Sequence, residues 1–217
     1  MRLIDDLYAE HVRIERTVGA LLTFSSLRAR GDAPPGDGAA FLRFFRLFAG
    51  DFHHAKEEDT LFPALLRHLE LRPDSGPIFS LTRQHREMGR TLGELAPLLP
   101  LPALAPGDGE RMTSLATAYA HALLAHIDAE NSVLLPEGEE RLRRAGVTDL
   151  AGRAATDEER AAGDEGDRLA VLYPPGPGGA VRGEGCVICP SYGVTCEGLE
   201  REWWTDHEWE AFESREG

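Results

Sequence analysis

The chain has 217 residues, enough for one domain with a sizeable core and an appendage. Its formal net charge of −14 argues against a nucleic-acid partner, because such binding draws most of its affinity from clustered Lys and Arg. No apolar run approaches the ~20 residues of a membrane span, and the first residues lack the order of a signal peptide. We therefore expect a cytoplasmic protein that does not bind membranes.

Four long segments with apolar residues at helical spacing predict an all-α fold, and strand-like alternation is absent. The predicted helices cover about residues 3–30, 39–71, 78–99 and 110–144. The remaining predicted units are a peripheral helical segment over 146–173, a Pro/Gly linker over 174–185 and a small acidic tail with Cys and Trp over 186–217. We expect residues 1–145 to form one bundle domain.

Two prolines fall inside apolar helical runs. Pro63 lies in the second predicted helix and Pro136 in the fourth. Because proline lacks a backbone donor, each is expected to kink or end its helix.

Two segments of the chain occur twice. The stretch from His53 to Pro63 returns 73 residues later as His126 to Pro136, with the His, a Glu four places after it, a Leu and the Pro in register. A second stretch, HVRIERTVGAL from residue 11, returns 74 residues later as HREMGRTLGEL. Each half therefore offers one lone His and one His-x-x-x-Glu pair.

These residue types at this spacing favour a binuclear metal site. Residues four apart project from one face of a helix, so each His-x-x-x-Glu pair can point into a bundle interior. Four imidazoles and two carboxylates buried there would need a cation to offset their desolvation. Mixed nitrogen and oxygen ligands favour non-haem iron or manganese over Ca²⁺, Mg²⁺ or structural Zn²⁺. We expect iron, since the order differs from the Glu-x-x-His pattern of ferritin-like sites.

The chain resembles the hemerythrin-like family, the HHE cation-binding domains, over about residues 1–145. The resemblance rests on the lone His of the first helix and on FHHAKEEDTLFP, QHREMGR and HIDAENSVLLP. It implies an up-down four-helix bundle around two Fe ions linked by an oxo or hydroxo bridge, with both glutamates bridging. The implied ligands are His11, His53, Glu57, His85, His126 and Glu130.

One position departs from the family pattern. Oxygen-carrying hemerythrins have a second His one turn after the His of helix three, where this chain has Gly89. His54 lies about 60° around its helix from Glu57 and is expected to supply the missing imidazole, the alternative being that it faces water and pairs with Glu58. Without this imidazole, an open coordination position would favour reaction at the metal over simple oxygen carriage.

Four polar residues near the motifs are weighed separately. Glu58 and Asn131 each follow a ligand Glu and are either exposed or hydrogen-bonded to the free ring nitrogen of a ligand His. His121 is expected at the surface or in a supporting position, and His68 is expected to be structural.

The tail carries a second candidate metal site made of Cys186, Cys189, Cys196 and His207. Three thiolates and one imidazole can bind zinc, and so short a segment needs a staple to fold alone. A redox or iron–sulfur role is a second interpretation. Reduced thiols in a tail whose Trp-rich helix docks on the bundle or recruits a protein partner are the third.

Three functions stay open on the sequence. The first is a non-haem di-iron protein that binds or reacts with O₂, NO or peroxide, for sensing, scavenging or stress response. The second is an iron-handling or interaction module whose metal is structural and whose tail recruits a partner. The third is a di-iron oxidase or peroxidase. No catalytic residue is predicted.

Overall fold

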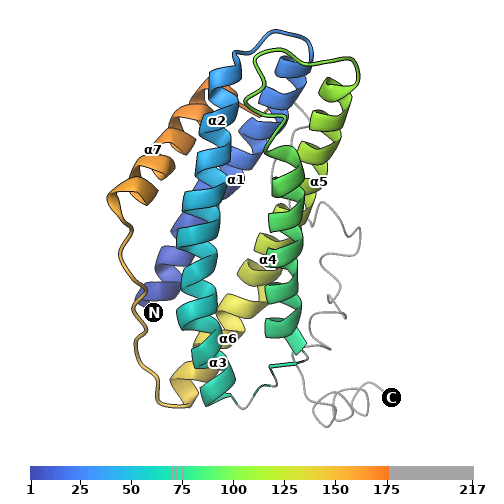
Figure 1. Cartoon of the computed structure of the whole chain (residues 1–217). Helices are drawn as coiled ribbons and strands as arrows, with labels where there is room; N and C mark the ends of the chain where they lie inside the picture. Colours follow the sequence, from blue (N-terminus) through green and yellow to red (C-terminus); the bar gives the residue numbers. More distant parts are fainter. Residues whose placement is uncertain (70, 72, 75, 176–217) are drawn as a thin grey trace.

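The computed structural model describes residues 1–69, 71, 73, 74 and 76–175, and all regular structure within them is helical (Figure 1). The prediction of an all-α fold is confirmed. The elements, with η marking a π-helical segment, are α1 (Arg2–Ala29), α2 (Pro35–Arg43), η1 (Phe44–His54), η2 (Glu57–Leu61), α3 (Phe62–His68), α4 (Gly76–Leu95), α5 (Asp108–Ala129), η3 (Glu130–Leu134), α6 (Leu135–Arg144) and α7 (Asp157–Leu172).

Two helix boundaries differ from the prediction. The helix α2 begins at Pro35, inside a stretch predicted as a loop, because proline at the first helical position loses no hydrogen bond. The helix α4 ends at Leu95 instead of near residue 99, since Pro97 has no amide to continue it. Both prolines act through the missing N–H: Pro35 at the beginning of α2, and Pro97 after the end of α4.

Neither Pro63 nor Pro136 ends its helix. Before each proline the chain widens into a π turn that begins at a glutamate. The N–H of Phe62 donates to the carbonyl of Glu57, and the N–H of Leu135 to that of Glu130. The α-helix then resumes with proline in its first turn, where no intrahelical donor is needed. The expected break is therefore a local change of helical pitch beside the predicted ligands.

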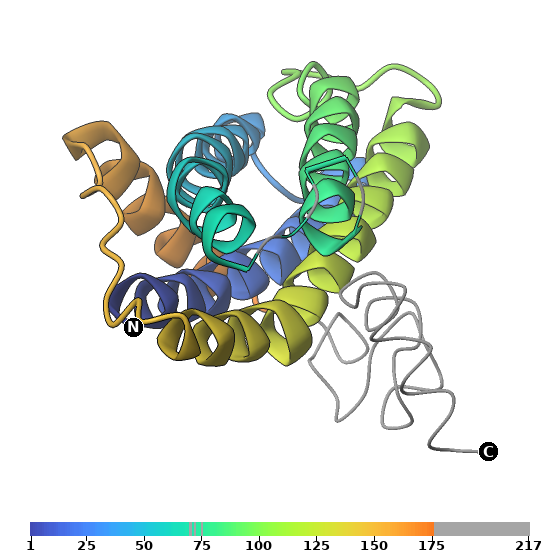
Figure 2. The same cartoon turned by 90° about the horizontal axis from the view of Figure 1, so that it is seen from below.

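The long helical stretches pack side by side (Figure 1). The helix α1 lies against α5, and α5 also lies against α4. The last helix, α7, packs on α1, α2 and η1, and Figure 2 shows it at the outside of the assembly. No helix in the described part of the chain is long and apolar enough to cross a membrane.

Two apolar clusters fill the interior on either side of a polar layer. The larger cluster includes Val18, Phe24, Phe45 and Leu123, and the smaller cluster lies nearer the N-terminus. The smaller cluster includes Leu3, Leu7, Leu61, Leu81 and Leu135. Along each long helical stretch, the predicted His and Glu ligands fall between these two sets. The sequence thus builds a polar layer that apolar packing closes from both ends.

The helix α7 is fixed to the bundle by close packing and by ion pairs. Arg13 Nη2 lies 2.7 Å from Asp167 Oδ2, and Tyr173 donates its hydroxyl to Asp37 at 2.6 Å. Gly166 lets α7 approach the fully buried ring of Phe44, since a Cβ at this position would overlap that ring. The peripheral helix is therefore packed against the same core as the long helices.

We expect Gly166→Ala to lower the free energy of unfolding by about 1–3 kcal/mol, because the added methyl must displace a packed aromatic ring. Gly93→Ala is the matched control: Gly93 is exposed on α4 and has open space around its Cβ position. It should raise stability by up to about 1 kcal/mol through helix propensity. Urea denaturation of both variants measures this, and equal shifts of the same sign would contradict the packing argument.

Candidate metal centre

The repeated histidines and glutamates come together in the polar layer. The contributions are His11 from α1, His53 and His54 from η1, Glu57 from η2, His85 from α4, His126 from α5 and Glu130 from η3. All are buried, with at most 7% of the residue surface exposed, except His54, which is partly exposed. The structure thus brings together every residue that the sequence assigned to the bundle site.

The seven side chains form two groups of potential ligands. The first group is His11, His53, Glu57 and Glu130. The second group is His54, Glu57, His85 and His126. Within each group the ligand atoms lie within 4.8 Å of one another, close enough for a single cation to contact them all.

Glu57 lies between the two groups and presents one oxygen to each. Its Oε1 is 3.5 Å from His53 Nε2, and its Oε2 is 3.4 Å from His85 Nε2. A carboxylate in this position can contact two cations at once.

Glu130 does the same from the other repeat. Its Oε2 is 3.2 Å from His11 Nε2, and its Oε1 is 3.3 Å from His126 Nε2. The two carboxylates therefore span both groups, as the predicted bridging role requires.

Most of the atoms that face the centre lack hydrogen-bond partners, whereas Nε2 of His85 and Nε2 of His126 lie 2.9 Å apart and pair with each other. The unpartnered buried atoms are Nε2 of His11, His53 and His54 and both carboxylate oxygens of Glu57 and Glu130. In the described part of the chain, only two other buried side-chain atoms share this condition, Arg28 Nε and Glu165 Oε2. Because buried polar groups without partners are costly, so dense a set requires an additional binding partner. Imidazole nitrogens and carboxylate oxygens fit non-haem iron or manganese.

Glu58 and Asn131 hold two of these imidazoles from behind. His85 Nδ1 donates to Glu58 Oε1 at 2.7 Å, and His11 Nδ1 donates to Asn131 Oδ1 at 2.7 Å. Both residues therefore contact histidines of the centre, and Glu58 is at the same time exposed. Such bonds fix the ring orientation and aim Nε2 at the centre.

Sequence reasoning missed the other two supporting residues. Glu10 Oε2 accepts from His53 Nδ1 at 3.0 Å, and Gln84 Oε1 accepts from His126 Nδ1 at 2.9 Å. Each directly precedes the lone His of its repeat. Their equivalent places in the duplicated segments were the signal that could have identified them.

A family model, the hemerythrin HHE cation binding domain, matches residues 2–137. The chain belongs to this family. Neither curated proteins nor solved structures gave a significant match. The matched segment runs from α1 into α6 and contains both groups of the centre, whereas α7 lies beyond it. Both His/Glu groups therefore lie within the segment that matches the HHE cation binding domain.

His54 stands in the second group, as the sequence predicted from the departure at Gly89. Its ring stacks on that of His85, with centroids 4.0 Å apart and planes at 14°. A Cβ placed at Gly89 would meet no heavy atom within 4 Å. The stretch η1 thus supplies the His54 imidazole to the second group. The helix α4 supplies His85 but has a glycine at position 89, where oxygen-carrying hemerythrins have a second histidine.

Lys56, the only lysine of the chain, supports the first group. It is 2% exposed, and its ammonium group pairs with the Glu10 carboxylate that holds His53. The same ammonium lies 4.4 Å from the centre of the Phe52 ring. The carboxylate of Glu10 thus contacts both the ammonium group of Lys56 and the imidazole of His53.

Burial and charge give the metal-free centre a definite protonation pattern. Burial lowers the pKa of His85, but hydrogen bonds with the Glu57 and Glu58 carboxylates outweigh it and raise the pKa to about 9. For Glu57 burial acts upward, and the neighbouring His53 and His85 outweigh it and hold the pKa well below its usual range. An imidazolium and a carboxylate thus face each other at neutral pH.

Glu130, His54 and His126 shift toward their neutral forms, whereas, against the effect of burial, the Glu130 and Glu57 carboxylates raise the pKa of His11. Burial and the negative charge of Glu57 raise the pKa of Glu130 to about 7. Burial and the positive charge of His85 lower the pKa of His54 and His126 well below 6.5. A bound cation would replace the proton on His85 and any proton on Glu130, so binding should release protons.

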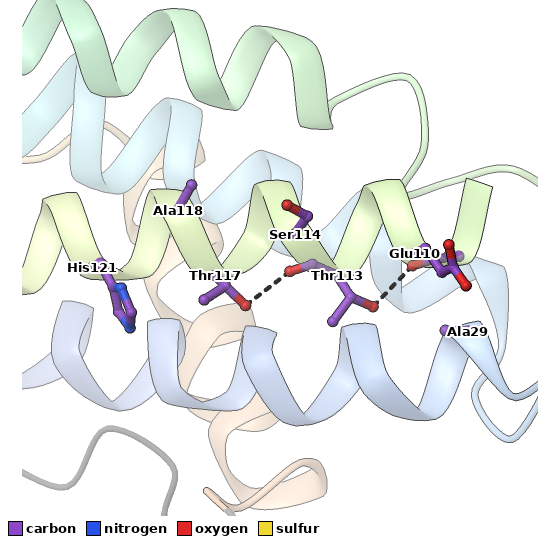
Figure 3. Close-up of a pocket in the computed structure, with 8 residues that line it drawn as sticks. Ala29, Glu110, Thr113, Ser114, Thr117, Ala118 and His121 are labelled. Atoms are coloured by element: carbon purple, nitrogen blue, oxygen red, sulfur yellow. Dashed lines mark hydrogen bonds between the residues drawn. The ribbon is translucent and has the colours of Figure 1, made fainter. Parts of the chain in front are cut away.

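The other two histidines lie outside the centre. His121 is exposed on α5 and lines an open groove of about 670 Å³ between α5 and the end of α1 (Figure 3). The hydroxyls of Thr113 and Thr117 in this groove donate to backbone carbonyls one turn earlier, at 2.9 Å each. His68, the last residue of α3, is exposed and joins neither group.

The second predicted site falls beyond the part of the chain that the structure describes. It comprises Cys186, Cys189, Cys196 and His207. The predicted linker begins within reach of the bundle, since Pro174 accepts a hydrogen bond from the Thr23 hydroxyl at 3.0 Å.

The protonation pattern predicts how metal binding depends on pH. His85 has a folded pKa of about 9 against 6.5, and Glu130 one of about 7 against 4.5. Protonation of each group stabilises the metal-free fold, and this contribution is complete at a pH below the unfolded pKa of the group. It is lost as the pH rises through the folded pKa. The metal-loaded fold needs both groups deprotonated. The difference in Tm between loaded and metal-free protein should therefore widen from pH 6 to pH 9.

Thermal denaturation of both forms across this range provides the measurement. His121→Gln, a change outside the centre, should leave the widening intact. A constant difference in Tm would contradict the assigned protonation states.

The outer hydrogen bonds predict a graded loss of affinity. Gln84→Ala leaves His126 Nδ1 without its acceptor, so the metal affinity should fall about 10- to 100-fold while the fold persists. Arg83→Ala, at the exposed neighbouring position, is the control and should change little. Competition with a chelator of known affinity measures both. Equal affinities in the two variants would remove the supporting role of Gln84.

Proposed function

We propose that this protein is a non-haem di-iron protein that binds or reacts with O₂, NO or peroxide, in sensing, scavenging or stress response. The observation that carries the proposal is the pair of ligand groups that share Glu57, with Glu130 of the first group beside His126 of the second. In the proposal an up-down four-helix bundle holds the two Fe ions, linked by an oxo or hydroxo bridge, and the protein works in the cytoplasm.

The proposed ligand sets follow the two groups. His11 and His53 hold one iron, and His54, His85 and His126 hold the other. Glu57 and Glu130 bridge them, which is supported by the placement of one oxygen of each carboxylate toward each group. A centre with nitrogen-rich ligation of this kind supplies reversible electron transfer to a small oxidising molecule or diatomic gas.

The rest of the chain prepares the site for that chemistry. Outer partners hold four imidazoles by Nδ1, so that Nε2 is aimed before the metal arrives. The two apolar clusters exclude bulk water from above and below the polar layer. Exclusion of water strengthens each electrostatic contact within the centre.

The metal stoichiometry tests the proposal directly. Protein purified without oxygen should contain about two iron atoms per chain. Glu57→Ala and Glu130→Ala should each lose most of this iron and the stability that it confers, because each removes a shared oxygen pair. Glu94→Ala, an exposed change on α4, should keep it. Full iron content in both carboxylate variants would contradict the assignment of a di-iron centre.

Gas exposure then separates the rival functions. Optical spectra of the reduced protein should change on addition of O₂ or NO, and deletion of residues 176–217 should preserve these changes. In the rival proposal the metal is structural, the spectra stay silent, and the same deletion abolishes binding of a protein partner. Zinc bound by the cysteine tail would disappear with this deletion, while the iron stays.

A further inference from the structure

A pocket of about 310 Å³ adjoins the second group of the centre. It lies between η1 and α4, and His54 and His85 form part of its lining. In Figure 2 these two stretches, coloured blue to cyan and green, have no other helix between them. The pocket is thus a path from the protein surface to the imidazoles of the second group.

Missing side chains keep the pocket open. Gly50 on one side and Gly89 and Gly93 on the other line it. The two glycines of α4 are four residues apart and therefore share one helix face. A Cβ at either would meet no heavy atom within 4 Å, so a larger side chain would extend into free space.

The walls between the glycines are mainly apolar, and the charged Arg46 and Asp51 also line the pocket. Phe45, Met88 and Leu92 contribute the apolar walls, and each is at least nine-tenths buried. Tyr119 completes the wall at 2% exposure, and its hydroxyl makes no hydrogen bond with a described residue. A volume near the lower end of small-molecule sites and far above that of a diatomic gas suits a ligand with several carbon atoms.

His54 differs from the other imidazoles of the centre. Each of the other four donates Nδ1 to an outer partner, whereas His54 makes no hydrogen bond with any described residue. It is also the one partly exposed member of the two groups. Since an outer hydrogen bond fixes a ligating ring, His54 is the ligand most easily displaced.

We propose that this pocket binds a small molecule with a polar, metal-binding head and an apolar body, and that the head takes the place beside His85 that His54 otherwise fills. Organic hydroperoxides and short-chain carboxylates share this chemistry. The proposal rests on the proposed di-iron function and adds a ligand class and an exchangeable ligand to it. Gly89 then keeps the pocket open for the ligand, since a histidine at this position would occupy it.

Unreactive carboxylates of increasing length provide the test. The iron-loaded oxidised protein is titrated with acetate, butyrate and hexanoate, and binding is followed by the visible spectrum. Affinity should rise with length, by up to about four-fold per buried methylene. Gly89→Phe and Gly50→Leu should abolish the rise by filling the pocket, while Gly36→Phe, at an exposed helical glycine with open space, should keep it.

His54→Ala tests the exchange separately. It should strengthen binding of all three carboxylates by a similar factor, because the head no longer competes with an imidazole. Unchanged acetate affinity, or loss of iron from the second group, would overturn the exchange. Affinity independent of chain length, or a rise that survives both filling variants, would overturn the pocket. Iron content is measured in each sample, so failure of the di-iron proposal appears as missing iron in the unmodified protein.

Discussion

Desolvation of the polar layer is the constraint on which the rest of the structure depends. Six of the seven candidate ligand residues are almost completely buried, and most of the atoms that face one another across the centre have no hydrogen-bond partner among the described residues. Without a cation, burial and the charge of Glu57 raise the pKa of Glu130, whereas the Glu57 and Glu58 carboxylates raise the pKa of His85 against the effect of burial. The polar layer is therefore more stable with a bound cation than without one.

The duplicated sequence yields a paired but unequal centre. Glu10 and Gln84 occupy equivalent places in the repeats, and each holds the His that begins the following His-x-x-x-Glu motif. Only Glu10 carries a charge, which the single lysine balances. On the other side, the second group includes His54, which has no outer hydrogen-bond partner among the described residues. The first group is thus held more firmly, and the second is open to exchange beside a pocket.

The π turns connect backbone geometry to the centre. The two short ones, η2 and η3, each begin at a glutamate of the centre and end just before the helical turn that contains proline. The wider turn accommodates the missing proline N–H and changes the direction in which the following residues project. Wide turns of this kind often mark functional sites, and here both fall at the carboxylates. The repeated Pro in the sequence is therefore part of the geometry of the ligands.

The sequence by itself determined the four long helices, because helical periodicity is a local property, and its duplication singled out four histidines and two glutamates. The seventh candidate, His54, came from the resemblance to hemerythrins and the departure at Gly89. The helix ends near Pro35 and Pro97 could have been set more closely by proline chemistry alone. Only the tertiary structure decided that the helices continue through Pro63 and Pro136, that Glu10 and Gln84 support the imidazoles, and that a pocket opens at Gly89. These features arise between helices far apart in the chain, where packing, not local propensity, fixes which side chains meet.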